Sequence, residues 1–88
     1  MDKMVKDFGE FIKNKRIERG LSQGEAAKLI GISQAAYSRY ELGHRDPGLN
    51  MMRAIAKALH FHPSEFFDGY MKRYAWYQER LDEMHEEK

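Results

Sequence analysis

The chain of 88 residues contains no cysteine, which excludes a disulfide framework and any metal site that depends on thiolate ligands. Only two prolines interrupt it. No apolar run approaches the roughly 18 residues that a membrane-spanning helix needs. The charged start, MDKMVKDFGEF, also lacks the apolar segment of a signal peptide. We therefore expect a cytoplasmic protein without a membrane partner.

A strong charge of one sign is missing as well. The 15 lysines and arginines are nearly balanced by 14 aspartates and glutamates, for a net charge of +1. A protein coated with basic residues is thus excluded, and any contact with nucleic acid must come from a local basic face. The chain length suits one small domain with a modest core. We expect this domain at residues 1–68 and an added helix, acidic at its end, at residues 69–88.

Apolar residues recur at helical spacing, and no segment alternates as a strand does, so the pattern predicts an all-α fold. Helices are expected over residues 4–19, 23–31, 34–42 and 49–60, with a short fifth helix from Pro63. The side chains expected to face inward from the last two helices are Leu49, Met52, Ile55, Ala56, Leu59, Phe66 and Phe67.

Residues 23–42, QGEAAKLIGISQAAYSRYEL, are the most informative part of the chain. Ser22 and Glu25 have the spacing of a capping box that opens a helix. Ala27 is small enough for two helices to cross closely, and Gly31 allows a turn that a side chain would resist. The pattern indicates two short helices joined at a tight corner, a unit that can insert its second helix into the major groove of DNA.

Two opposite charges fall on inward faces of the expected helices. Arg16 follows Ile12 by four residues, and Glu41 follows Tyr37 by four residues. A lone buried charge is costly, so we expect Arg16 and Glu41 to form a salt bridge between the first and third helices.

With these residues in place, the chain resembles the helix-turn-helix domain of the lambda-repressor/Cro-like family, also called the Xre family, over about residues 8–67. The resemblance implies a five-helix lambda-repressor-like DNA-binding domain, to which the C-terminal amphipathic helix is added. It also implies a transcription regulator, usually a dimer on a palindromic operator. The matching features, in order, are Arg16, Leu21-Ser22-Gln23, Ala27, Gly31, Ser33-Gln34, Ser38-Arg39, Glu41, Gly43, Pro47 and Ala56.

The expected recognition helix, residues 34–42, presents side chains that suit base edges. Gln34 can pair with adenine and Arg39 with guanine, while Ala35 can contact a thymine methyl group and Ser38 offers a hydroxyl. Phosphate contacts are expected where a helix begins or basic and amide side chains are exposed. The candidates are Gln23, which the family uses in this way, with Lys13, Asn14, His44 and Arg45.

A few positions depart from the family pattern. Gly24 replaces a better helix former, Lys15 a commonly apolar residue, and His60 the usual glycine after the fourth helix. Tyr37 and Tyr40 are bulkier than the common branched aliphatic residues. These departures concern packing and stability more than the groups that read DNA.

The C-terminal residues carry a seam at heptad-like spacing, formed by Tyr70, Tyr74, Tyr77, Leu81 and Met84. Three interpretations stay open: the helix folds back on its own domain, pairs with a second copy to make a homodimer, or binds another protein such as a toxin or an anti-repressor. We place its acidic end away from DNA.

No pattern indicates an enzyme or a cofactor, because paired carboxylates, a phosphate-binding loop and a nucleophile motif are all missing. His60 and His62 lack an evident third ligand, so no metal site is expected. The sequence thus favours a repressor that binds double-stranded DNA. The alternative is an antitoxin or protein-interaction module that acts mainly through the C-terminal helix.

Overall fold

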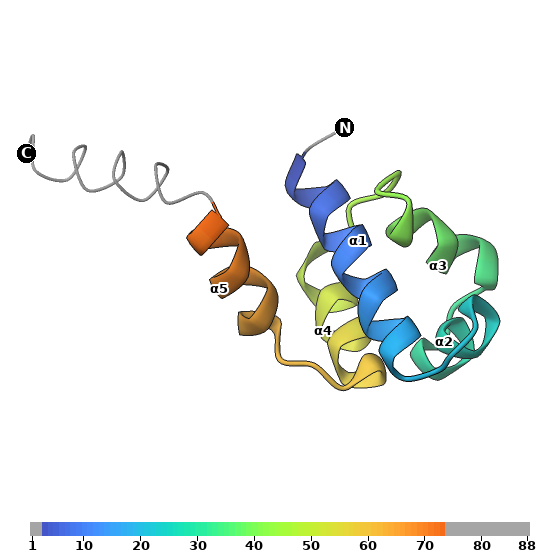
Figure 1. The fold of residues 1–88 in the computed structure, drawn as a ribbon. Helices are drawn as coiled ribbons and strands as arrows, with labels where there is room; N and C mark the ends of the chain where they lie inside the picture. The colour runs from blue at the N-terminus through green and yellow to red at the C-terminus, as the bar shows by residue number, and fades with distance from the viewer. Residues whose placement is uncertain (1–2, 74–88) are drawn as a thin grey trace, which may run out of the picture.

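Five helices make up the part of the chain that the computed structural model describes, residues 3–73, with side chains described through residue 69 (Figure 1). In the view of Figure 1, α5 lies on the opposite side of α1 from α3. None of these helices is long and apolar enough to cross a membrane. Their bounds are Lys3–Glu18 for α1, Gln23–Ile30 for α2, Gln34–Glu41 for α3, Gly48–Leu59 for α4 and Pro63–Arg73 for α5.

The ends of the central helices are fixed by local hydrogen bonds. Ser22 Oγ accepts a bond from the backbone N–H of Glu25, and the Glu25 carboxylate accepts one from the Ser22 N–H, so the expected capping box is present. Ser33 caps α3 through the N–H of Ala36. Gly31 ends α2 with φ of 92°, a left-handed conformation that glycine adopts without steric cost.

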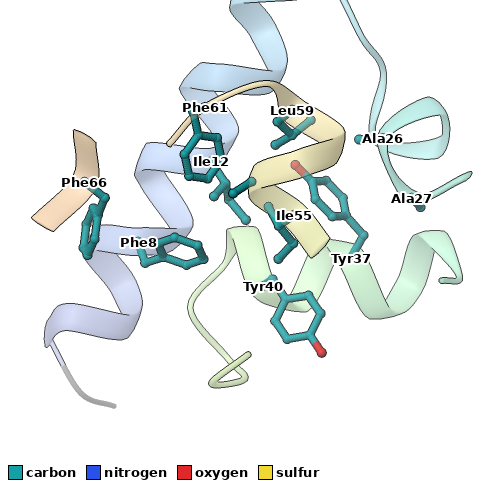
Figure 2. Packing of buried hydrophobic residues seen from close by; sticks show 11 residues of the cluster. Phe8, Ile12, Ala26, Ala27, Tyr37, Tyr40, Ile55, Leu59, Phe61 and Phe66 are labelled. Carbon is teal, nitrogen blue, oxygen red and sulfur yellow. The ribbon is translucent and has the colours of Figure 1, made fainter. Parts of the chain in front are cut away.

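The core lies where α1, α3 and α4 meet, and Figure 2 shows Tyr37 pointing from α3 toward Ile55 and Leu59 of α4. Ile12, Tyr37 and Ile55 are completely buried. The expectation that Leu49 faces inward was wrong, because this side chain is 77% exposed. It lies in the first turn of α4, whereas the buried side chains of α4 all come from its second half.

Aromatic rings join α5 to α1. Phe66 meets Phe8 and Phe11 edge to face, at centroid distances of 5.3 and 5.4 Å, and Phe61 of the α4–α5 connection meets Phe11 at 5.0 Å. Such pairs stabilise the interface beyond the area that they bury. Phe67 is only partly buried against this cluster.

Helix α5 is longer than the short helix expected from the sequence. It runs without interruption across residues 68 and 69, where we placed the boundary between the domain and the C-terminal helix. Of the predicted seam, the backbone of Tyr70 belongs to α5, while Tyr74, Tyr77, Leu81 and Met84 lie outside the described residues.

The two histidines considered for metal binding, His60 and His62, lie at the end of α4 and just before the start of α5. His60 ends α4 with φ of 58°, a left-handed conformation, which accounts for the glycine usual at this position in the family. His62 Nδ1 lies 2.8 Å from Ser64 Oγ just before the first turn of α5.

Gly9 sets how closely α1 approaches the end of α3. A Cβ atom built on Gly9 would lie 2.5 Å from the backbone oxygens of both Tyr40 and Glu41. Real Cβ atoms do not approach oxygen so closely, so any side chain at position 9 would force the two helices apart. Gly69 in α5 is the opposite case, because a Cβ there meets no atom of the described residues within 4 Å.

We predict that Gly9→Ala destabilises the domain while Gly69→Ala stabilises it. The first change wedges α1 from α3 and should cost about 2 kcal/mol or more, as overpacking against rigid neighbours does. The second removes helix-disfavouring backbone entropy and should contribute about 0.5–1 kcal/mol. Urea unfolding followed by circular dichroism measures both. A Gly9→Ala variant as stable as the wild type would contradict the close approach.

Candidate nucleic-acid interface

Helices α2 and α3 form a compact pair that packs one face against the core and exposes the other. Ala26 and Ala27 of α2 are buried, as are Tyr37 and Tyr40 of α3, so apolar contacts hold the inner side of the pair. This is the corner that the sequence predicted, with a small residue at the crossing and Gly31 at the turn.

The outer face of α3 carries the four side chains that we expected to read bases. Gln34, Ala35 and Arg39 are exposed, and Ser38 is half-buried. Positions 34, 35, 38 and 39 fall on one side of a helix with 3.6 residues per turn, and Tyr37 and Tyr40 point to the other side. The structure therefore brings the four candidates together on one accessible surface.

A buried carboxylate ties this pair of helices to α1. Glu41, whose side chain is 3% exposed, accepts hydrogen bonds from Arg16 Nε at 2.6 Å and from Arg16 Nη2 at 3.2 Å. The amide of Gln23 donates to the same carboxylate at 3.0 Å, and Arg16 Nη1 donates to the backbone oxygen of Leu21 at 2.8 Å. The expected Arg16–Glu41 bridge is present, and it extends to α2.

Electrostatics match this geometry. Burial works to raise the pKa of Glu41, but hydrogen bonds from Arg16 and Gln23 together hold it below its ordinary value. The same pairing raises the pKa of Arg16. Beside them, burial raises the pKa of Tyr37. The buried hydroxyl of Tyr37 has no hydrogen-bond partner within the described part of the chain. Glu41 therefore stays ionised at neutral pH, and the network is a charged one.

The candidate phosphate ligands separate into groups. Gln23 and Lys13 line one open pocket next to α3, together with Lys6, Glu10, Glu41 and Leu42. Asn14 instead lines a groove between α1 and α5, with Glu65 and Phe66 among its neighbours. The structure thus does not bring Asn14 to the surface that Gln23 and Lys13 share.

His44 and Arg45 follow the end of α3 and are both exposed. The His44 N–H donates to the Arg39 backbone oxygen at 2.9 Å, which keeps this turn close to the recognition helix. The Arg45 guanidinium lies 6.0 Å from the centroid of the Tyr40 ring.

Lys6 is a residue that our sequence reasoning missed. It precedes Lys13 by seven residues, a spacing that puts both on one side of α1, and this spacing was the available signal. Gly24 was noted only as a weak helix former. In the structure it is the point where α2 meets the Gln34 side chain, since a Cβ on Gly24 would lie 3.2 Å from Gln34 Oε1.

We predict that Arg16→Ala lowers the free energy of unfolding far more than Lys15→Ala, a change at the neighbouring position. Losing Arg16 leaves the buried Glu41 carboxylate without its cation, a change that costs about 3 kcal/mol in comparable buried pairs. Lys15 pairs with Glu65 at the surface, where the two side chains are 23% and 46% exposed, so its loss should be clearly smaller. Urea unfolding of both variants makes the comparison, and similar losses would count against a special role for Arg16.

The Glu41 network should also contribute to the pH dependence of stability. The folded pKa of Glu41 is lowered, so its contribution is complete above the unfolded pKa, ordinarily 4.5 for this group, and is lost as the pH falls through the folded pKa. The stability advantage of the wild type over Glu41→Gln should therefore shrink below pH 4.5. Unfolding free energies at a series of pH values measure it. An advantage that stays constant down to low pH would show that the charge of Glu41 is not responsible.

Known proteins share this architecture and this sequence pattern. The HTH_3 helix-turn-helix family model matches residues 12–66, more than half of the chain. The restriction-modification controller protein C.Esp1396I has the same fold, with a TM-score of 0.73, 22% sequence identity, and coverage of 82% of this chain and 94% of that one.

Two relatives are transcription regulators by name. One is the SPbeta prophage-derived uncharacterized regulator YonR of Bacillus subtilis (strain 168), 35% identical over 52 residues, which are 59% of this chain and 48% of that protein. The other is the cryptic phage CTXphi transcriptional repressor RstR of Vibrio cholerae, 38% identical over 50 residues, which are 57% and 45%. The chain spans about half the length of each. With the family match over residues 12–66, the chain belongs to the Xre-like helix-turn-helix family.

Proposed function

We propose that the protein is a sequence-specific, double-stranded DNA-binding regulator of transcription, a repressor that binds a palindromic operator as a dimer through α3. The observation that carries this proposal is the two-sided character of α3. Its inner face is fixed by Tyr37, Tyr40 and the Glu41 network, while its outer face is free and carries groups that recognise bases. A rigid helix with a free polar face suits insertion into the major groove.

The outer face supplies complementary kinds of base contact. The Arg39 guanidinium can donate two parallel hydrogen bonds to guanine, and the Gln34 amide can donate to and accept from adenine. Between them, the Ala35 methyl group can contact thymine, and Ser38 offers a hydroxyl that both donates and accepts. This mixture of groups favours sequence-specific binding over non-specific binding to any duplex.

The pocket beside α3 supports contact with the DNA backbone. The Gln23 amide nitrogen gives one hydrogen to Glu41 and keeps a second for a phosphate oxygen. It lies at the start of α2, where the helix dipole favours an anion. Lys6 and Lys13 line the same pocket and supply positive charge. In this proposal these groups fix the register of α3 on the duplex.

A dimer follows from the way such domains occupy palindromes. Two copies related by a two-fold axis would present their α3 helices about 34 Å apart, one turn of the duplex. The relative RstR, a transcriptional repressor, supports repression as the outcome. Pairing through the seam of residues 70–84 is one of the three interpretations that the sequence left open, and in this proposal it is how the two copies meet.

Selection from a pool of random duplexes, using the whole chain at moderate salt, tests the proposal directly. We expect enrichment of an inverted repeat whose half-sites lie about one turn apart. Binding to the enriched site should weaken steeply with salt, by about 0.9 in log–log slope for each phosphate that is neutralised. A folded protein that enriches no sequence would move the function to a protein partner, such as a toxin or an anti-repressor, held by the C-terminal segment.

Arg39→Ala and Gln23→Ala should fail in different ways. Arg39→Ala is expected to cost about 1–3 kcal/mol on the best site and to relax the preference at one base pair of each half-site. Gln23→Ala is expected to weaken all sequences alike, because phosphate contacts carry no sequence information directly. Fluorescence anisotropy with the selected duplex and its single-base variants gives both answers.

Arg53→Ala is the matched control for charge, since Arg53 is exposed on α4 and outside the α2–α3 pair. It should leave base preference unchanged. If Arg39→Ala behaved like Arg53→Ala, α3 would not be the element that reads sequence.

A further inference from the structure

Gly24 is the second residue of α2, and its Cβ position lies next to the side chain of Gln34, the first residue of α3. A Cβ atom built on it would lie 3.2 Å from Gln34 Oε1, 3.8 Å from Gln34 Cδ and 3.9 Å from Ser22 Oγ. All three are side-chain atoms. The Gln34 side chain therefore rests against the start of α2, in space that any other residue at position 24 would share.

Nothing else in the surroundings of Gly24 requires a glycine. Its φ is not among the positive values found at Gly20, Gly31, Gly43 and Gly48. At Gly9 the nearest atoms of other segments are backbone atoms, whereas at Gly24 they are side-chain atoms that can move. Glycine inside a helix is nevertheless unfavourable relative to alanine. The space that it leaves for Gln34 is the feature that distinguishes this position.

The amide group of Gln34 takes a defined place because of that space. Its oxygen lies over the first turn of α2, at the positive end of the helix dipole, where a hydrogen-bond acceptor is favoured. An alanine at position 24 would require the oxygen to shift by a few tenths of an ångström. A bidentate contact with a base edge is sensitive to such a shift, because two hydrogen bonds must align at once.

We propose that Gly24 is a specificity-determining residue that acts through Gln34. By having no side chain, it lets the Gln34 amide rest on α2 and so sets the position from which this amide meets its base. This inference rests on the proposed function, in which α3 reads bases. Gly24 itself touches no DNA in this scheme and is a positioning residue.

The test compares Gly24→Ala, Gln34→Ala and the double variant on the selected operator and on duplexes changed at one base pair. Gln34→Ala first identifies the base pair that Gln34 reads. At that pair, Gly24→Ala should lower discrimination about 3- to 10-fold, a fraction of the roughly 5- to 150-fold that a whole bidentate contact contributes. Preference at the pair read by Arg39 should not change. In the Gln34→Ala background, adding Gly24→Ala should have no further effect on preference.

Folding does not obscure this test, because Gly24→Ala raises helix propensity and displaces only the end of a flexible side chain. Gly69→Ala is the matched control, a glycine-to-alanine change in a helix far along the chain from α3, where no atom of the described part of the chain lies near the new Cβ. It should leave every base preference as in the wild type.

Three results would overturn the inference. In the first, Gly24→Ala leaves base preference unchanged although Gln34→Ala alters it. In the second, Gly24→Ala alters base preference to the same extent in the Gln34→Ala background as in the wild type. Gln34→Ala could also change no preference while Arg39→Ala does, which would remove Gln34 from base reading. If neither Gln34→Ala nor Arg39→Ala altered any preference, the proposed function itself would have failed, a result distinct from these three.

Discussion

The arrangement of α1, α2 and α3 depends on the carboxylate of Glu41. This group is almost completely buried, so water cannot solvate it, and its hydrogen bonds come from Arg16 on α1 and Gln23 on α2. Apolar contacts allow helices to slide at small cost, but a buried charge loses its partners when they do. We infer that this network selects one relative placement of the three helices, and that the direction of the α3 outer face follows from it.

Much of this could be read from the sequence because local rules and packing agree. The capping box at Ser22 and the left-handed turn at Gly31 follow from residue type and spacing alone. The Arg16–Glu41 pair could be inferred because two opposite charges occupied positions that the periodicity places inward. The four candidate base-reading positions on α3 shared one face for the same reason, as helical geometry fixes them relative to Tyr37.

The remainder depends on contacts between elements, which spacing does not record. Leu49 fits the apolar stripe of α4, but its side chain in the first turn of the helix is 77% exposed. Asn14 is next to Lys13 in sequence, yet the packing of α5 gives it a different surface. The need for a glycine at position 9 comes from the backbone of α3 lying against it, a contact that the sequence of α1 does not record. The length of α5 was missed because Asp68-Gly69 resembles a helix end, whereas the helix continues.

Under the proposed function, the shortness of α3 limits how much DNA sequence one copy of the domain can read. Its eight residues span about 12 Å, the length of roughly four base pairs. A word of four letters drawn from four bases recurs by chance about once in 256 positions, while a genome offers about a million or more competing sites. One helix alone would therefore match many sites in a genome and could not select a single one. Each further copy that binds in fixed register lengthens the recognised sequence and lowers the number of sites that match it by chance. Specificity then increases with the number of copies and needs no longer helix.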